Sequence, residues 1–131
     1  MLSVLRIVVG LLYFEHGTQK VWNLPPLGPP HVFHLMSQQG LAGVLETVGG
    51  LAILIGLFTR PVAFVLAGEM AWAYFQVHIR RSLFPIDNRG DSVVLFCFVY
   101  LYLVFAGAGS WSVDALVARS KRRRAADTLT G

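Results

Sequence analysis

Residues 40–61 read GLAGVLETVGGLAILIGLFTRP, and this stretch indicates how the whole chain is built. Its apolar part, residues 41–58, approaches the ~20 residues that a helix needs to cross the hydrocarbon core of a membrane. One carboxylate, Glu46, lies inside it, close to the paired glycines Gly49 and Gly50. A charged group at that depth costs several kcal/mol, so it needs a partner or a purpose. The stretch therefore predicts a membrane-spanning helix with one polar, interior face.

The composition of the whole chain agrees with a membrane protein. Of the 131 residues, 55% are hydrophobic and 14% are charged, whereas soluble domains carry about 25% charged residues. The high apolar content also excludes a disordered chain, and the length allows one domain, residues 1–131. The single cysteine, Cys97, excludes a disulfide framework, a CxxC redox pair and a cysteine zinc site.

Three further apolar stretches have the length of membrane spans. Together with residues 41–58 they predict an all-α, integral membrane four-helix bundle, with the other spans at residues 2–22, 62–79 and 91–108. We expect Thr59 to cap the third span, and the spacing of Asn88 and Asp91 predicts a capping box at the fourth.

The segment after the fourth span is expected to leave the membrane. Residues 112–119 predict a short interfacial helix with Trp111 as its anchor, followed by a basic tail over residues 119–131. The run KRRR at residues 121–124 is interpreted as facing lipid headgroups, and no nucleic-acid partner is expected, because no base-reading fold accompanies it.

Basic residues predict the orientation of the spans. One side of the membrane would hold seven of the eleven Lys and Arg residues, and this side contains both termini. Because basic residues are enriched on the cytoplasmic side, we expect a multi-pass protein of a bacterial inner membrane with both termini cytoplasmic. The seven are Arg6, Arg60, Arg119, Lys121, Arg122, Arg123 and Arg124, and the other side holds Lys20, Arg80, Arg81 and Arg89.

Polar side chains repeat at helical spacing along three spans, which predicts interior seams. Glu15 falls on the opposite face of the first span, where its partner stays open. The glycines on the first two seams are typical of close helix contact. The first seam is Arg6, Gly10, Tyr13, Gly17 and Lys20, the second is Glu46, Gly49, Gly50, Ile53 and Leu57, and the third is Glu69, Trp72, Gln76 and Arg80.

Depth along the helices predicts a pocket that opens to the non-cytoplasmic side. His16 lies roughly 9 Å from the outer end of its helix, Glu46 lies at a similar depth, and Glu69 lies near mid-helix. The alternative interpretation is structural, in which Glu46 pairs with Lys20 or His16 and only holds the helices in register. The candidate ligand-binding residues are Tyr13, His16, Lys20, Glu46, Glu69, Trp72, Gln76, Asn88 and Asp91.

Metal and haem sites are weakly supported by the sequence. His31 and His34 have metal-ligand spacing but are only two ligands in a proline-rich loop, so no metal is expected. His16 and His78 lie at matching depth on different spans and could be the two axial ligands of a haem. Two histidines at matching depth are weak evidence, so haem is not the favoured interpretation. Cys97 lies in an apolar run and is expected to be an inert core thiol.

Five motifs, in order and spacing, resemble the DoxX family of small bacterial membrane proteins. Together they cover most of the chain: RIVVGLLYFEHGTQK (residues 6–20), GLAGVLETVGGLAILIGLFTRP (residues 40–61), GEMAWAYF (residues 68–75), FPIDNRGD (residues 84–91) and AGAGSWSVD (residues 106–114). Residues that the family pattern favours are all present: His16, Gly17, Lys20, Glu46, Gly50, Arg60, Glu69 and Met70. The departure is NRGD at residues 88–91, where relatives commonly read NGGE.

The resemblance implies a four-helix membrane protein associated with respiratory or sulfur redox chemistry. Some members are named as subunits of quinol oxidase or thiosulfate–quinone oxidoreductase systems. Others are linked to protection against oxidative stress.

Three functions stay open at this point. The first is a redox-linked subunit whose pocket holds a quinone or another apolar ligand, with a soluble or membrane redox enzyme as its electron source. The second is a non-catalytic scaffold for such an enzyme, and the third is a small proton-linked transporter. No self-sufficient catalytic motif is present, so catalytic residues and homo-oligomer formation also stay open.

Overall fold

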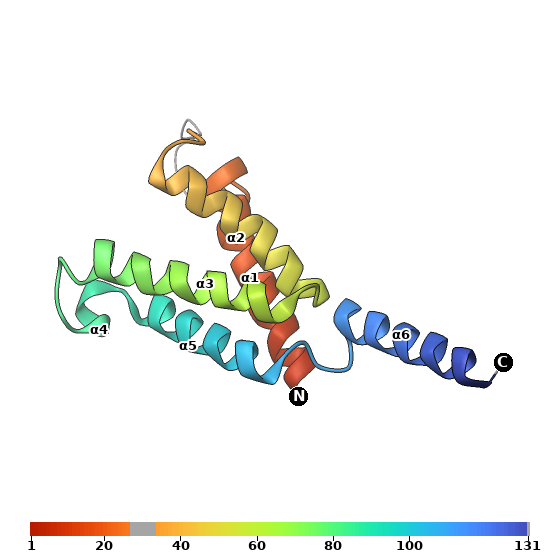
Figure 1. Ribbon diagram of the computed structural model, residues 1–131. Coiled ribbons are helices and arrows are strands. Elements are labelled where there is room, and N and C mark those ends of the chain that lie inside the picture. The colour runs from red at the N-terminus through yellow and green to blue at the C-terminus, as the bar shows by residue number, and fades with distance from the viewer. Residues whose placement is uncertain (27–33, 131) are drawn as a thin grey trace.

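The computed structural model describes residues 1–26 and 34–130, and all regular structure in these residues is helical (Figure 1). The all-α prediction is confirmed. The helices are α1 (Leu2–Trp22), α2 (Gln38–Ile55), α3 (Thr59–Ala73), the π-helical turn η1 (Tyr74–His78), α4 (Pro85–Asn88), α5 (Asp91–Ala106) and α6 (Val113–Thr130).

The helices associate mainly as two pairs. α1 packs along α2, α3 packs along α5, and contacts between α2 and α3 join the pairs. A buried apolar core connects all four, with Tyr13 from α1, Ile53 from α2, Leu66 from α3 and Tyr100 from α5 each at most 1% exposed. α6 continues away from these helices (Figure 1).

Glycines bring α1 and α2 into backbone contact. A Cβ added at Gly10 would lie 2.6 Å from the backbone nitrogen of Leu54, and one added at Gly50 would lie 2.6 Å from that of Phe14. Only a residue without a side chain fits at such positions. The predicted seam on the first helix is confirmed by the burial of Arg6, Gly10, Tyr13 and Gly17.

The predicted third seam is wrong beyond Glu69. Trp72, Gln76 and Arg80 are exposed, and the packed face of α3 is instead apolar, consisting of Ala63, Leu66, Ala67 and Met70 with Thr59 at its start. For Gln76 and Arg80 the reason is the π-helical turn, which changes the number of residues per turn, so a constant 100° spacing loses register past Ala73.

Two predicted helix caps are also wrong. Thr59 does not cap α3, because the carboxylate of Asp114 accepts hydrogen bonds from the backbone nitrogens of Phe58 (2.8 Å) and Thr59 (2.9 Å). Asn88 and Asp91 form no capping box at α5, whose N-cap residue is Gly90. Asn88 instead folds the connector, because it accepts from the Gly90 nitrogen and donates to the Ser82 carbonyl, both at 2.8 Å.

The C-terminal helix is longer than predicted. It was expected over residues 112–119, but α6 continues to Thr130, through most of the expected basic tail. Residues 113–130 contain neither Gly nor Pro and are rich in Ala and Arg, which favour a helix. α2 likewise begins at Gln38, earlier than expected, because the Ser37 hydroxyl accepts from the Gly40 nitrogen at 3.0 Å.

Arg6 closes the end of the molecule that carries the N-terminus. Its side chain is 1% exposed, and its guanidinium donates to two carbonyls in the last turn of α2, those of Ile53 and Leu54. It also donates to the carbonyls of Ala108 (2.8 Å) and Trp111 in the connector after α5. Helix C-termini leave carbonyls without partners and carry partial negative charge, so a buried cation is stabilised there.

By length and composition, one helix in the described part of the chain, α2, is sufficient to cross a membrane. α5 is also apolar but has 16 residues.

Replacing Arg6 should destabilise the fold far more than replacing an exposed arginine. We expect Arg6→Met to lower the free energy of unfolding by about 3 kcal/mol, because four carbonyls lose a charged donor. The measurement is an unfolding titration in detergent, with Arg60→Met as the control because the side chain of Arg60 is exposed. Equal stability of the two variants would contradict the assigned role of Arg6.

Two glycine-to-alanine variants should have opposite effects. Gly10→Ala pushes a methyl group against the α2 backbone and should cost about 1–3 kcal/mol. Gly68→Ala should be neutral or stabilising by up to about 1 kcal/mol, because a Cβ there meets no atom within 4 Å and alanine favours the helix. The same titration measures both variants. A Gly10→Ala protein with the same free energy of unfolding as the unmodified protein would disprove close contact at this position.

Candidate functional site

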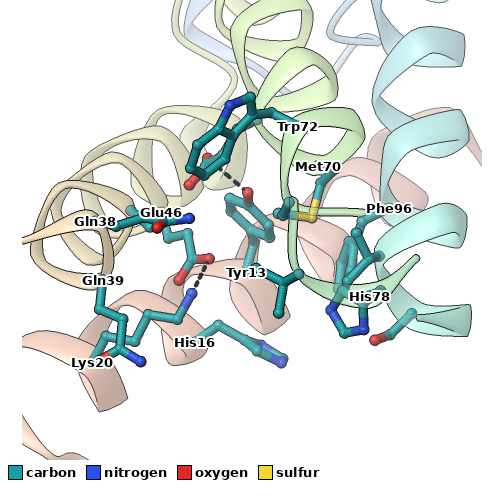
Figure 2. A pocket seen from close by; sticks show the side chains of 16 residues that line it. Tyr13, His16, Lys20, Gln38, Gln39, Glu46, Met70, Trp72, His78 and Phe96 are labelled. Carbon is teal, nitrogen blue, oxygen red and sulfur yellow. Dashed lines mark hydrogen bonds and ion pairs between the residues drawn. The ribbon is translucent and has the colours of Figure 1, made fainter. Parts of the chain in front are cut away.

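A cavity of about 340 Å³ lies between α1, α2, α3 with η1, and α5, toward the C-terminal end of α1 and so away from Arg6 (Figure 2). Its walls combine aromatic and apolar side chains with a small number of polar groups, which is the usual character of a small-molecule pocket. The lining residues are Tyr13, His16, Lys20, Gln38, Gln39, Ala42, Glu46, Glu69, Met70, Trp72, Ala73, Val77, His78, Ser92, Val93 and Phe96.

An ion pair between α1 and α2 forms one polar wall. Lys20 Nζ donates to Glu46 Oε1, with the lysine side chain 34% exposed and the glutamate side chain 4% exposed. The other carboxylate oxygen, Glu46 Oε2, is buried and has no hydrogen-bond partner in the described part of the chain. The pair therefore neutralises Glu46 but leaves one of its acceptor atoms unused.

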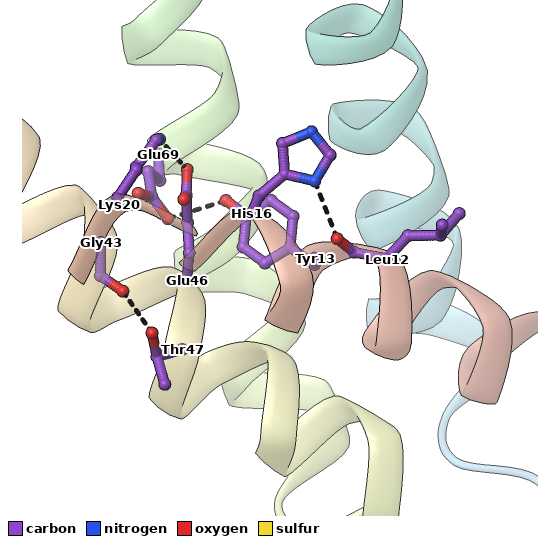
Figure 3. Close-up of polar contacts among 8 residues, drawn as sticks. All are labelled: Leu12, Tyr13, His16, Lys20, Gly43, Glu46, Thr47 and Glu69. Carbon is purple, nitrogen blue, oxygen red and sulfur yellow. Dashed lines mark hydrogen bonds and ion pairs between the residues drawn. The ribbon is translucent and has the colours of Figure 1, made fainter. Parts of the chain in front are cut away.

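A second carboxylate, on α3, is held by a tyrosine from α1. Tyr13 Oη donates to Glu69 Oε2 at 2.9 Å (Figure 3). The Tyr13 ring is fixed by edge packing on Tyr100 (centroids 5.1 Å apart) and by a tilted contact with Phe96 (5.4 Å). Among the residues described, none bonds the buried oxygen Glu69 Oε1. Each of the two carboxylates thus keeps one open acceptor.

Two histidines complete the polar lining. His16 Nδ1 lies 2.8 Å from the Leu12 carbonyl, and His78 Nδ1 lies 3.0 Å from the Asn88 carbonyl. Because a carbonyl only accepts, Nδ1 of each ring carries the hydrogen of this bond. His78 also stacks on Tyr74, which holds it at the pocket.

The arrangement is suited to a flat, largely apolar molecule with polar atoms at its edges. Phe96, Met70 and Trp72 supply apolar and aromatic surface, and the carboxyl and imidazole groups supply hydrogen-bond partners. Carboxyl groups accept a hydrogen bond when ionised and donate one when protonated, so the same site can bind a hydroxyl or a carbonyl.

Six of the nine predicted site residues line this cavity: Tyr13, His16, Lys20, Glu46, Glu69 and Trp72. The other three do not. Gln76 is exposed and accepts from Arg80 at 3.1 Å, Asp91 is exposed at the start of α5, and Asn88 is buried in the connector that it folds. Helical spacing placed Gln76 on the side of the pocket, but the π-helical turn lies between Ala73 and Ile79 and alters that spacing, and Asn88 lies in the α4 connector, which no helical pattern describes.

Sequence reasoning missed several lining residues. His78 was considered only as an axial haem ligand opposite His16, and Gln38, Gln39 and Phe96 were not singled out, although they help to complete the walls. Met70 belongs to a motif that resembles the DoxX family, and this was the only available signal for it.

No metal centre is visible in the described residues. No group of three or more His, Cys, Asp or Glu side chains there has metal-ligand geometry. His31 lies outside the described residues, so the spacing of His31 and His34 remains untested. Cys97 donates to the Ala67 carbonyl at 3.4 Å within the α3–α5 contact, which fits a core thiol.

Breaking the Lys20–Glu46 ion pair from one side should destabilise the protein more than removing it completely. We expect Lys20→Met to cost about 3–5 kcal/mol, because a buried carboxylate loses its cation. The double variant Lys20→Met with Glu46→Gln should recover most of that loss. A double-mutant cycle of unfolding free energies measures the coupling between the two side chains. Strictly additive effects would show that Lys20 and Glu46 do not stabilise each other.

Comparisons with known proteins place the chain in a family. The family model DoxX matches residues 1–79. An uncharacterized protein of Haemophilus influenzae is 39% identical over 124 residues, covering 86% of this chain and 87% of its own length.

Two more distant relatives carry descriptive names. An uncharacterized membrane protein of Mycobacterium tuberculosis is 25% identical over 88% of this chain and 80% of its own length. The Bacillus subtilis protein "Putative oxidoreductase CatD" is 22% identical over 91% of this chain and 88% of its own. No solved structure matches the chain. The extent of the family-model match, together with the Haemophilus influenzae relative, shows that this chain belongs to the DoxX family.

Proposed function

We propose that this chain is a multi-pass inner-membrane protein in which α1, α2, α3 with η1, and α5 form a membrane-spanning four-helix bundle. The outward faces of these helices support the proposal, because they expose large apolar side chains such as Val8, Val48, Phe64 and Phe98. Contiguous exposed apolar surface of this kind needs a lipid or protein partner. The Mycobacterium tuberculosis relative is itself named a membrane protein.

The bundle is oriented with both termini in the cytoplasm. The N-terminus and the start of α6 lie at the same end, where the backbone nitrogen of Trp111 donates to Ser3 Oγ at 3.3 Å. The basic residues of α6 and Arg60 belong to this end, and basic segments favour the cytoplasmic side. The cavity then opens toward the opposite, non-cytoplasmic side.

We infer that the cavity binds the ring of a quinone-like ligand and that the protein serves as a redox-linked subunit. The observation that carries this proposal is the pair of buried, unpartnered oxygens, Glu46 Oε2 and Glu69 Oε1, beside an apolar and aromatic cavity. An unsatisfied buried acceptor costs about 1–3 kcal/mol, and a ligand that bonds it recovers that free energy. The quinol form of such a ligand carries two hydroxyl groups at the edges of a flat apolar ring, and these can donate to the two open acceptors, whereas the carbonyls of the quinone form can only accept.

The residues of this chain provide binding and protons rather than electrons. Reduction of a quinone to a quinol takes two electrons and two protons. A partner redox enzyme supplies the electrons, and the carboxyl groups of Glu69 and Glu46 are placed to exchange protons with the ring oxygens. The oxidoreductase name of the Bacillus subtilis relative is in line with this role.

A continuous transport path is less well supported than a binding pocket. Between the cavity and the Arg6 end, Ile53, Leu66, Tyr100 and Leu103 are 0% exposed and pack into one apolar core. A proton or solute path needs polar groups across the whole membrane.

Trp72 allows ring binding to be measured directly. In a Trp22→Phe, Trp111→Phe background it is the remaining tryptophan, and a decyl-tailed benzoquinone should quench its fluorescence saturably. Reduced decyl benzoquinol should compete with the quinone for this site, and Glu69→Gln should weaken quinol binding about tenfold or more, because a quinol hydroxyl that donates to the charged carboxylate is worth about 1.5–3 kcal/mol.

The controls are Gln76→Ala and Asp91→Asn, whose side chains lie outside the cavity and should leave the affinity unchanged. Circular dichroism verifies that each variant is folded. Quenching that rises linearly without saturation, or that is equal in all variants, would refute the quinone site and favour the scaffold function.

A further inference from the structure

A groove runs from the cavity along the seam between α2 and α3. Directly beside the cavity lies a second hollow of about 350 Å³, which shares Gln38, Ala42, Glu69 and Trp72 with it. A third hollow of about 300 Å³ follows and shares Leu45 and Val65 with the second. We call these two hollows together the α2–α3 groove.

The groove changes from polar to apolar along its length. Gln38 and Glu69 lie where it meets the cavity, and the lining beyond them is apolar. It ends near Ala52 and Pro61, about 14 residues along α2 from Gln38, a distance of roughly 21 Å. This is a large part of the ~30 Å hydrocarbon thickness of a bilayer.

The groove is open to the surface, and at one position in its wall no side chain fills the space. Leu41, Val48 and Val65 on its sides are 56%, 64% and 50% exposed. Gly68 lies in its wall, and a Cβ at this position would meet no atom within 4 Å. The other glycine in the groove, Gly49, is different, because a Cβ there would lie 2.7 Å from a methyl carbon of Leu66. Gly68 thus leaves space that no other part of the described chain fills.

We propose that the α2–α3 groove holds the hydrocarbon tail of the ligand whose ring occupies the cavity, and that the ligand enters sideways from the bilayer. This inference rests on the proposed quinone site and names the class of ligand, a ring with one long isoprenoid or alkyl chain. Continuity of a polar-lined cavity with an apolar groove matches a molecule with one polar ring and one apolar chain. Glu69 lies where ring and tail would meet.

The groove should determine where the tail lies rather than how strongly the ligand binds. A tail that moves from lipid into the groove leaves one apolar environment for another, so it gains little from the hydrophobic effect. The decisive measurement is therefore the position of the tail.

The test uses a benzoquinone whose decyl chain ends in a photoreactive diazirine, added to the full chain in lipid nanodiscs. After illumination, peptide mass spectrometry should find the label concentrated on groove residues Leu45, Val48 and Val65. Labelling should be several-fold weaker on Val8 and Phe98, which are exposed at 48% and 66% on helix faces away from the groove. Excess unlabelled decyl benzoquinone should remove the groove label.

Gly68→Leu is the blocking variant, because its side chain enters open space and leucine favours a helix more than glycine does. It should abolish the groove label while the tail-free benzoquinone still quenches Trp72. Val8→Phe is the matched control, which enlarges an exposed side chain elsewhere and should leave the groove label intact.

The outcomes separate the two proposals. If the tail-free benzoquinone fails to quench Trp72 saturably in the Trp22→Phe, Trp111→Phe background, the quinone site itself is wrong. If it does quench but the diazirine labels all exposed faces equally, or labels the groove unchanged in Gly68→Leu, the groove inference alone is wrong. A groove label that survives excess decyl benzoquinone but disappears when phospholipid is added would assign the groove to bilayer lipid and overturn the inference.

Discussion

The buried guanidinium of Arg6 joins the two helix pairs at one end of the molecule. It donates to carbonyls in the last turn of α2 and to carbonyls that follow α5, so one side chain from α1 ties together three helices. The Asp114 carboxylate, placed by the same C-terminal connector, then caps α3. Because helix ends leave backbone groups without partners inside the helix, these side chains satisfy groups that the helices themselves cannot.

The opposite end has the reverse character and holds the candidate site. There, Lys20–Glu46 and Tyr13–Glu69 link the helices, but each carboxylate keeps one buried oxygen without a partner among the described residues. At the Arg6 end all three guanidinium nitrogens donate, and the buried Thr59 hydroxyl is the unpartnered side-chain atom there among the described residues. A polar network left incomplete beside a cavity is costly unless something binds there, which is why we assign function to this end.

Much of this arrangement was predictable from spacing alone. Arg6, Gly10, Tyr13 and Gly17 repeat at helical intervals, and all four are buried on the predicted face. Six of nine predicted site residues line the cavity, among them His16 and Glu46, which were selected by their depth along the helices. Gln76 was misplaced because the π-helical turn breaks the 3.6-residue period, and Asn88 because its bonds to Ser82 and Gly90 depend on the fold of the connector.

The sequence by itself determined the helical class, the positions of the main helices and the faces on which glycines and carboxylates lie, since these follow from local periodicity and composition. The tertiary structure alone decided which partners meet across 47 or more positions of chain, as in the Arg6 bonds to Ile53 and Trp111, the Asp114 cap on α3 and the Tyr13–Glu69 bond. It also decided that the space beside Gly68 stays open. Such contacts depend on how helices cross, and crossing is set by side-chain packing between segments that no local pattern relates.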